Sequence, residues 1–217
     1  NSIVGNNIAN NYDGIWLSSS SNNNICGNNI AANNYDGIVL DSSSNNFISG
    51  NTFIDDGLLV CGSYRNVVED NIVNGKPLVY LEDVADYRVG DAGQVILVNC
   101  TGIRVENLNL SRTDVGLQLW KTSNSIISGN NITNNWYGIW LNYSSNNNIC
   151  GNNIANNEYG IRLSSSSNNS IVGNNIANNG YSIYLDSSSN NAIYHNNIVN
   201  NIQNVYLSMD SANVWDN

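Results

Sequence analysis

Apolar residues return along this chain at a nearly fixed interval of 22 or 23 residues. Each unit contains an apolar pair whose members are separated by one variable residue. This period-2 alternation is typical of a strand with one buried face. The first members of the pairs are Ile15, Ile38, Leu58, Val79, Ile96, Leu117, Ile139, Ile161, Ile183 and Val205. The second members are Leu17, Leu40, Val60, Leu81, Val98, Leu119, Leu141, Leu163, Leu185 and Leu207.

Two further apolar positions recur once in each unit. One ladder is Ile3, Ile25, Ile48, Val67, Ile103, Ile126, Ile149, Ile171 and Ile193. The other is Ile8, Ile30, Phe53, Ile72, Leu108, Ile132, Ile154, Ile176 and Ile198. Between the apolar positions lie mostly Asn, Ser, Gly and Asp, the residues that favour turns. No stretch shows the 3.6-residue period of a helix, so a helical solenoid is a poor fit.

The fixed period indicates identical units stacked on one another. A unit of 22 residues has a contour length of roughly 70 Å, which is enough for three short strands and three turns. We therefore expect an all-β protein, a right-handed parallel β-helix of about nine coils that forms a single domain over residues 1–217. The paired asparagines, such as Asn6 and Asn7, are expected to stack in hydrogen-bonded ladders at the turns.

The repeat is interrupted in the middle of the chain, where 36 residues separate Val67 from Ile103. The excess falls in residues 82–94, which we interpret as an excursion loop from the β-helix. Insertions of this kind often carry function, but a loop that only prevents slippage between similar coils remains an alternative. Six of the seven basic residues lie in the same third of the chain: Arg65, Lys76, Arg88, Arg104, Arg112 and Lys121.

The composition limits the partners that the chain can have. Seventeen acidic residues against seven basic ones give a formal net charge of −10 and a pI near 4.1. Nucleic acid and anionic membrane surfaces both require clustered Lys and Arg, so neither is an expected partner. No apolar run approaches the roughly 20 residues that span a bilayer, so membrane insertion is not expected either.

The repeated unit Asn-Asn-Ile-x-Asn-Asn-x-x-Gly-Ile-x-Leu resembles the NosD-like group of right-handed β-helix proteins. Residues 74–81 (Asn-Gly-Lys-Pro-Leu-Val-Tyr-Leu) and 95–100 (Val-Ile-Leu-Val-Asn-Cys) resemble the central signature of that group. The tail, residues 213–217, resembles the start of its closing motif. The resemblance implies a fold shared with carbohydrate-binding and sugar-hydrolysing β-helices, and an abundance in secreted and surface-layer proteins of archaea. It identifies a fold and a family, and carries little about activity.

NosD is named for copper delivery, and copper sites need clustered Cys, Met or His. This chain has one histidine, His195, one methionine, Met209, and four scattered cysteines. A copper-delivery role therefore remains an alternative only with ligands outside this chain. Cys61 and Cys100 fall near turns of adjacent coils, where we expect two free thiols and keep a disulfide as the alternative.

Acidic residues suggest one metal site and one catalytic alternative. Asp13, Asp36 and Asp56 each precede the glycine of their coil, so stacked coils would place them about 5 Å apart. Calcium could neutralise such a row and is the only cofactor that the residues suggest. The second alternative is a carbohydrate-active enzyme that uses Asp55, Asp56 and the central basic residues. The catalytic motifs of pectin hydrolases and alginate epimerases are absent, so no catalytic residue is assigned.

Aromatic residues recur on the solvent side of the strands and at a neighbouring turn. Such stripes can stack on sugar rings, although mutual stacking between coils would produce the same pattern. The candidate carbohydrate-binding residues are Trp16, Trp140, Tyr184, Tyr206, Tyr137 and Tyr159. Tyr12, Tyr35 and Tyr181 occupy the same turn as the last two.

We expect a non-catalytic extracellular or cell-surface module, with a periplasmic location as the alternative. Polysaccharide and neighbouring surface proteins are the partners that this assignment suggests. The sequence opens inside a repeat and stops before the expected closing motif, which suggests a piece of a longer protein. Both ends of the stack would then present unpaired strands, and we expect end-to-end self-association of the isolated piece.

Overall fold

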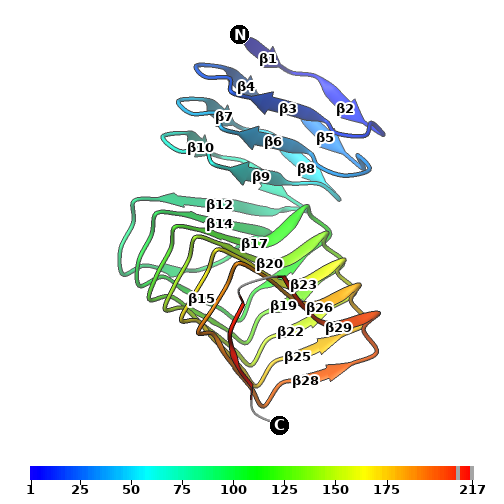
Figure 1. The fold of residues 1–217 in the computed structure, drawn as a ribbon. Helices are drawn as coiled ribbons and strands as arrows, with labels where there is room; N and C mark the ends of the chain where they lie inside the picture. Colours follow the sequence, from blue (N-terminus) through cyan, green and yellow to red (C-terminus); the bar gives the residue numbers. More distant parts are fainter. Residues whose placement is uncertain (209–210, 216–217) are drawn as a thin grey trace.

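The computed structural model describes residues 1–208 and 211–215. These residues form short strands joined by turns, and none of them lies in a helix. The strands coil around narrow apolar cores, which confirms the predicted all-β, right-handed parallel β-helix (Figure 1). Met209, Asp216 and Asn217, which the sequence interpretation had included, lie outside the described residues. Within the described part there is no helix long and apolar enough to cross a membrane.

The first three coils and the start of a fourth form a stack of their own, residues 1–73, called here the N-terminal stack (blue to cyan in Figure 1). One sheet contains β1 (Ser2–Val4), β4 (Asn24–Cys26), β7 (Phe47–Ser49) and β10 (Val67–Glu69). A second contains β3 (Ile15–Ser18), β6 (Ile38–Asp41) and β9 (Leu58–Cys61). Neighbouring strands are parallel, and their register places Ile3 beside Ile25 and Ile25 beside Ile48.

The third sheet runs through the whole molecule and has eleven strands. Its N-terminal part is β2 (Asn7–Ala9), β5 (Asn29–Ala31), β8 (Thr52–Ile54) and β11 (Ile72–Val73). Its C-terminal part is β12 (Lys76–Glu82), β14 (Gln94–Val98), β17 (Val115–Trp120), β20 (Tyr137–Asn142), β23 (Tyr159–Ser164), β26 (Tyr181–Asp186) and β29 (Gln203–Leu207).

Two more sheets complete the C-terminal stack, residues 76–208 and 211–215 (green to red in Figure 1). The first is β13 (Arg88–Val89), β15 (Arg104–Glu106), β18 (Ile126–Ser128), β21 (Asn148–Cys150), β24 (Ser170–Val172), β27 (Ala192–Tyr194) and β30 (Val214–Trp215). The second is β16 (Asn109–Ser111), β19 (Asn131–Thr133), β22 (Asn153–Ala155), β25 (Asn175–Ala177) and β28 (Asn197–Val199).

The chain reverses direction between the two stacks. Strands β11 and β12 are antiparallel, with Val73 opposite Lys76, so the connection is a two-residue hairpin. Its two residues, Asn74 and Gly75, have φ values of 50° and 81°. Positive φ at both central positions, with the sequence Asn-Gly, is the signature of a type I′ turn. The reversal is therefore encoded locally in the residues of the loop.

Because the strands reverse while the coils keep advancing, the core moves to the other face of the shared sheet. On β14, Val95 and Leu97 join the core of the C-terminal stack. Ile96 and Val98, which alternate with them, join the core of the N-terminal stack. All five residues of this strand are buried as a result. The outward face of the first C-terminal strands thus covers the end of the N-terminal stack.

Two glutamines satisfy the free edge of the last N-terminal strand, β9. Gln94 accepts a hydrogen bond from the Leu58 N–H (3.0 Å) and donates one to the Leu58 carbonyl (2.8 Å). Gln118 accepts from the Val60 N–H (3.2 Å) and donates to the Val60 carbonyl (2.6 Å). Buried backbone groups without partners are costly, and the two amide side chains take the place of a further strand.

Asparagine ladders bind each coil to the next, as the sequence predicted. In one ladder, the oxygen of Asn152 accepts from the backbone N–H and the side-chain amide of Asn130 (2.9 and 3.0 Å). The Asn152 amide donates to Asn174 and to the Ile127 carbonyl. The second asparagine of each pair forms an exposed ladder, such as Asn153 to Asn131 at 2.7 Å.

The structure corrects the register that we assigned near the middle of the chain. The residues in register with the apolar ladders of the neighbouring coils are Val68, Val73, Val95, Leu97, Val105, Leu110 and Ile127, in place of Val67, Ile72, Ile96, Val98, Ile103, Leu108 and Ile126. Residues 82–94 do not leave the β-helix as the predicted excursion. They form part of a coil, because Ala85 pairs with Thr101 and Val89 pairs with Val105. The hairpin, by starting a new stack, explains the irregular spacing.

Replacement of Asn152 by alanine should lower the free energy of unfolding by about 2–4 kcal/mol. The substitution leaves buried partners in two neighbouring coils unsatisfied, and each such group costs about 1–3 kcal/mol. The matched control is Asn153→Ala, which removes the exposed amide next to it and should cost less than about 1 kcal/mol. Denaturant unfolding measures both changes, and equal losses in the two variants would contradict the structural role of the buried ladder.

Candidate functional site

The outward faces of the two stacks meet in an aromatic corner. One wall is the solvent-facing side of β3, β6 and β9, and the other is the outward side of β20, β23, β26 and β29. The walls join where Val39 and Leu59 pack against Val115 and Trp140. The same reversal that moves the core to the opposite face leaves these two surfaces facing one another.

A continuous series of aromatic contacts crosses from one stack to the other in this corner. The ring centroids of Tyr12 and Tyr35 lie 4.2 Å apart, and those of Tyr35 and Trp136 lie 5.3 Å apart. The series continues from Trp136 to Tyr159 at 6.5 Å. Tyr159 stacks in turn on Tyr181 at 5.0 Å. These separations are in the range in which aromatic rings attract one another.

The structure brings five of the six predicted aromatic residues to the surface of the corner. Trp16 is 58% exposed, and Tyr206 lies at the far end of the opposite wall, where it stacks on Tyr184 at 4.5 Å. Tyr137 and Tyr159 are half-buried, with centroids 5.2 Å apart. These contacts show that the rings do stack on each other, the alternative that the sequence had left open. Their exposed faces remain available to a ligand.

Trp140 is the exception among the predicted binding residues, because its side chain is only 8% exposed. It packs against Val39 and Leu59 of the other stack, and its indole N–H donates to Ser164 (3.3 Å). Sequence periodicity places it correctly on the outward side of β20, but the opposite stack covers that side. Trp140 therefore joins the two walls and offers little surface for stacking.

The sequence interpretation missed Trp136, whose ring links the two stacks. It occupies the turn Asn-Asn-Trp-Tyr-Gly, which corresponds to Asn-Asn-Tyr-Asp-Gly in the first two coils. Counting back from the glycine would have aligned Trp136 with Tyr12 and Tyr35. The same count aligns Tyr137 with Asp13 and Asp36, which directly precede the glycine. The tyrosines that we had assigned to one turn position therefore occupy two adjacent positions.

A hollow of about 480 Å³ lies beside Tyr35 and Trp136, between the stacks. Asp55 and Arg112 line it and form an ion pair with an N–O distance of 3.3 Å. Asp114 also lines it. The hollow thus combines two exposed aromatic rings with charged and amide groups, the usual composition of a site for a polar ligand with apolar faces.

Two buried carboxyl groups, Asp56 and Asp114, lie near the half-buried Asp36 at this junction. Burial, followed by the neighbouring carboxylates Asp13 and Asp56, raises the pKa of Asp36 to about 6. Burial also raises the pKa of Asp56 to about 6, although two hydrogen bonds from Asn33 act in the opposite direction. The pKa of Asp114 is raised well above its usual range by burial and by Asp36, even though the Gly37 N–H donates to its carboxylate (2.9 Å).

The predicted calcium row does not form. Asp56 is fully buried and ends the asparagine ladder, where its carboxylate accepts two hydrogen bonds from Asn33 at 3.0 Å. The turn of this coil is shorter than those that contain Asp13 and Asp36, which is why Asp56 takes the asparagine position. In the described part of the chain, no group of three or more His, Cys, Asp or Glu side chains is arranged to hold a metal ion.

The acidic pair of the catalytic alternative is also separated. Asp55 lies at the rim of the hollow, whereas Asp56 turns into the protein and does not line the hollow. Cys61 and Cys100 are free thiols, as are Cys26 and Cys150.

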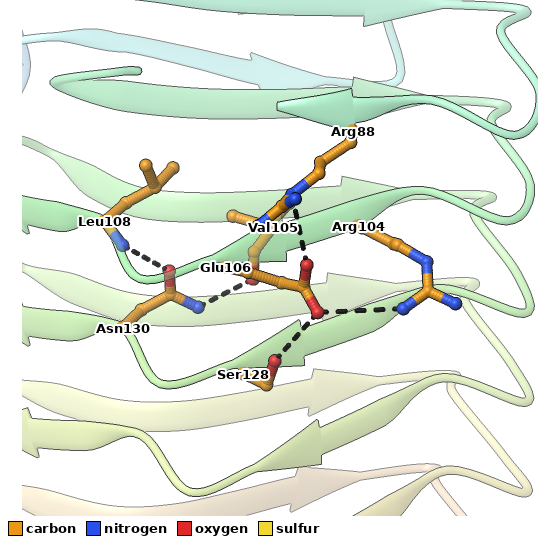
Figure 2. A network of polar contacts seen from close by, with 7 residues as sticks. All are labelled: Arg88, Arg104, Val105, Glu106, Leu108, Ser128 and Asn130. Atoms are coloured by element: carbon orange, nitrogen blue, oxygen red, sulfur yellow. Dashed lines mark hydrogen bonds and ion pairs between the residues drawn. The ribbon is translucent and has the colours of Figure 1, made fainter. Parts of the chain in front are cut away.

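The central basic residues do not converge on one site. Figure 2 shows Glu106 between Arg88 and Arg104, with N–O distances of 3.3 and 3.7 Å. Lys76 pairs separately with Asp91 at 3.1 Å. The basic members of these pairs are largely exposed, and such surface pairs contribute little to stability. The same view shows Asn130 accepting from Leu108 and donating to Val105, one rung of the buried ladder.

Comparison with known families decides the classification. The model of the family described as periplasmic copper-binding protein (NosD) matches residues 56–217, about three quarters of the chain. The chain belongs to the NosD family. A model for the right-handed β-helix region matches residues 1–89, so the NosD match begins just before the reversal. No curated protein matches this chain.

Several solved structures are similar to this chain at low sequence identity. A mutant of the periplasmic alginate epimerase AlgG has 16% identity and a TM-score of 0.47, with 82% of this chain and 58% of that chain covered. DFA-IIIase from Arthrobacter chlorophenolicus has 14% identity and a TM-score of 0.49, with 97% of this chain and 53% of the DFA-IIIase chain covered. A tailspike of an Escherichia coli bacteriophage has 15% identity and a TM-score of 0.48, with 97% of this chain and 38% of the tailspike chain covered. This chain therefore spans little more than half of the length of the two enzymes.

The junction carboxyls predict that stability falls as the pH rises. A carboxyl whose pKa is raised on folding stabilises the folded state below its unfolded pKa of about 4, and this contribution is lost as the pH rises through about 6. The free energy of unfolding should therefore decrease between pH 4 and 7, by on the order of 1–3 kcal/mol. Asp36→Asn should flatten this decrease.

The matched control for the pH experiment is Asp70→Asn, which removes an equal charge from an exposed turn. It should retain the wild-type dependence of stability on pH, measured by chemical unfolding at each pH. The same flattening in both variants would attribute the effect to net charge and would contradict the role of the junction.

Proposed function

We propose that this NosD-family chain is a non-catalytic carbohydrate-binding module that works outside the cytoplasm, in the periplasm or at the cell surface. The supporting observation is the aromatic corner, in which exposed rings from two stacks form one continuous surface. Polysaccharide is the proposed partner, and neighbouring surface proteins are the other class of partner that such a module would contact.

The chemistry of the corner suits a chain of sugar rings. The apolar faces of pyranose rings stack on aromatic side chains, while their hydroxyl groups need donors and acceptors at the edges. Exposed rings occur at Tyr12, Trp16, Tyr35 and Trp136. The asparagine amides of the adjoining turns, such as Asn34 and Asn134 beside the hollow, supply polar groups.

A preorganised scaffold favours such binding. Stacking between neighbouring rings and the ladders beneath them fix the aromatic side chains before a ligand arrives. Binding then costs less conformational entropy than it would on a flexible loop. A long solenoid also presents similar positions on successive coils, which suits a polymer with its own repeat.

Replacement of Trp136 by alanine should weaken carbohydrate binding about fivefold, equivalent to about 1 kcal/mol. An array of neutral and acidic glycans first identifies the glycan that the wild type binds, and calorimetric titration then gives the affinities. The matched control is Tyr143→Ala, an aromatic residue that is 61% exposed and makes none of the ring contacts of the corner. It should leave the affinity unchanged.

Two results would contradict the proposed function. One is a wild type that binds no glycan on the array. The other is an equal loss in Trp136→Ala and Tyr143→Ala, because binding would then not depend on the corner.

A further inference from the structure

Arg162 occupies the middle of the wall formed by the C-terminal stack. It lies on β23 in register with Trp140 on one side and Tyr184 on the other. Its guanidinium carbon is 5.3–5.5 Å from the ring centroids of these two residues and of Tyr137 and Tyr159. Attraction between a cation and the faces of aromatic rings holds the side chain in place.

The guanidinium retains unused hydrogen-bonding capacity. One terminal nitrogen donates to the Tyr137 hydroxyl at 3.0 Å. The Nε–H group is buried and has no partner in the described part of the chain. A buried donor without an acceptor costs about 1–3 kcal/mol, so this arrangement is expensive unless something else supplies the acceptor.

Arg162 also lacks a carboxylate partner. Among the described residues, no carboxylate oxygen lies within 4.0 Å of its guanidinium nitrogens, whereas Lys76, Arg88, Arg104 and Arg112 all form ion pairs. It is the only basic residue after Lys121 in a chain with a net charge of −10. Arg65 and Lys121 also form no ion pair in the described part of the chain, but each lies over a single ring, whereas Arg162 lies among four.

Other charged groups face the same part of the corner. The pKa of the Cys61 thiol on β9 is raised to about 12 by burial and then by Asp41 and Asp36, while Arg162 acts in the opposite direction. Arg162 therefore lies within electrostatic range of the opposite wall. It supplies the positive charge there, against the negative charge of the two aspartates.

We infer that the aromatic corner is selective for acidic carbohydrate, of the class that carries a carboxylate on each pyranose ring. Arg162 would bind that carboxylate through its free N–H groups, while the apolar ring face stacks on an exposed tyrosine such as Tyr206. A guanidinium matches a carboxylate in shape and forms two parallel hydrogen bonds with it, which an ammonium group cannot do. This inference rests on the proposed carbohydrate-binding function and specifies its ligand class.

The test compares each acidic oligosaccharide with its neutral methyl ester. The probes are hexamers of galacturonate, glucuronate and mannuronate, each in the free and the fully esterified form, which differ only in the charged group. The wild type should bind at least one acid about tenfold more tightly than its ester. Arg162→Gln should reduce that preference to less than about twofold while keeping ester binding, and Arg162→Lys should give an intermediate preference.

The control variant is Arg104→Gln, which removes an exposed cation from a strand outside the corner. It should keep the full preference for acid. A second measurement needs no substitution: the wild-type affinity for the acid should fall as salt is raised from 50 to 500 mM, on the order of several-fold, and the affinity for the ester should not. Thermal unfolding of each variant shows whether it has folded.

The outcomes separate the inference from the function on which it rests. Equal binding of acids and esters by the wild type, or an unchanged preference in Arg162→Gln, would overturn the selectivity and leave carbohydrate binding intact. Binding of a neutral glycan with none of the acids would do the same. A wild type that binds no acid, no ester and no other glycan would remove the proposed function together with the inference.

Discussion

A right-handed coil that reverses its strands has to move its core to the opposite face of the sheet. This geometric constraint follows from the two-residue turn at Asn74 and Gly75, where β11 and β12 become antiparallel. Without the reversal, the chain would be one straight β-helix with a uniform outer surface. With it, one sheet serves two cores, and the strand β14 has apolar residues on both faces.

Two consequences of this constraint account for the candidate site. The outward face of the first C-terminal strands closes the end of the N-terminal stack, so that no separate cap is needed there. Beyond that point, the same face diverges from β3, β6 and β9 and forms the aromatic corner with them. Trp140 and its apolar neighbours pack this joint, and close-packed interiors resist deformation. Function and architecture therefore depend on the same local turn.

Much of the fold could be predicted from the sequence, because each coil repeats the same spacing of apolar residues and asparagines. The register in the middle could not, because runs such as Val95 to Val98 are apolar at every position. Such a run has no polar side to show which residue faces the core, and here both sides are buried. The reversal was visible as an Asn-Gly pair, yet a periodic pattern on both sides suggested continuous winding.

The site was predicted in part, for a related reason. The period places Trp16, Tyr184 and Tyr206 on outward faces, and that placement is correct. Sequence spacing says nothing about which outward faces meet, so the burial of Trp140 and the bridging position of Trp136 became evident only from the structure. The predicted calcium row failed because a shorter turn moves Asp56 into the asparagine ladder. Small changes in turn length therefore decide which polar residues are available to a ligand.

Hydrogen exchange of the backbone amides in β9 tests the joined architecture most directly. The N–H groups of Leu58 and Val60 donate to the side chains of Gln94 and Gln118, which belong to the other stack. The account predicts that both amides exchange as slowly as those of the core strands, and that Gln118→Leu accelerates exchange at Val60 far more than at Leu58. Fast exchange of both amides in the wild type, as at a solvent-exposed sheet edge, would contradict it.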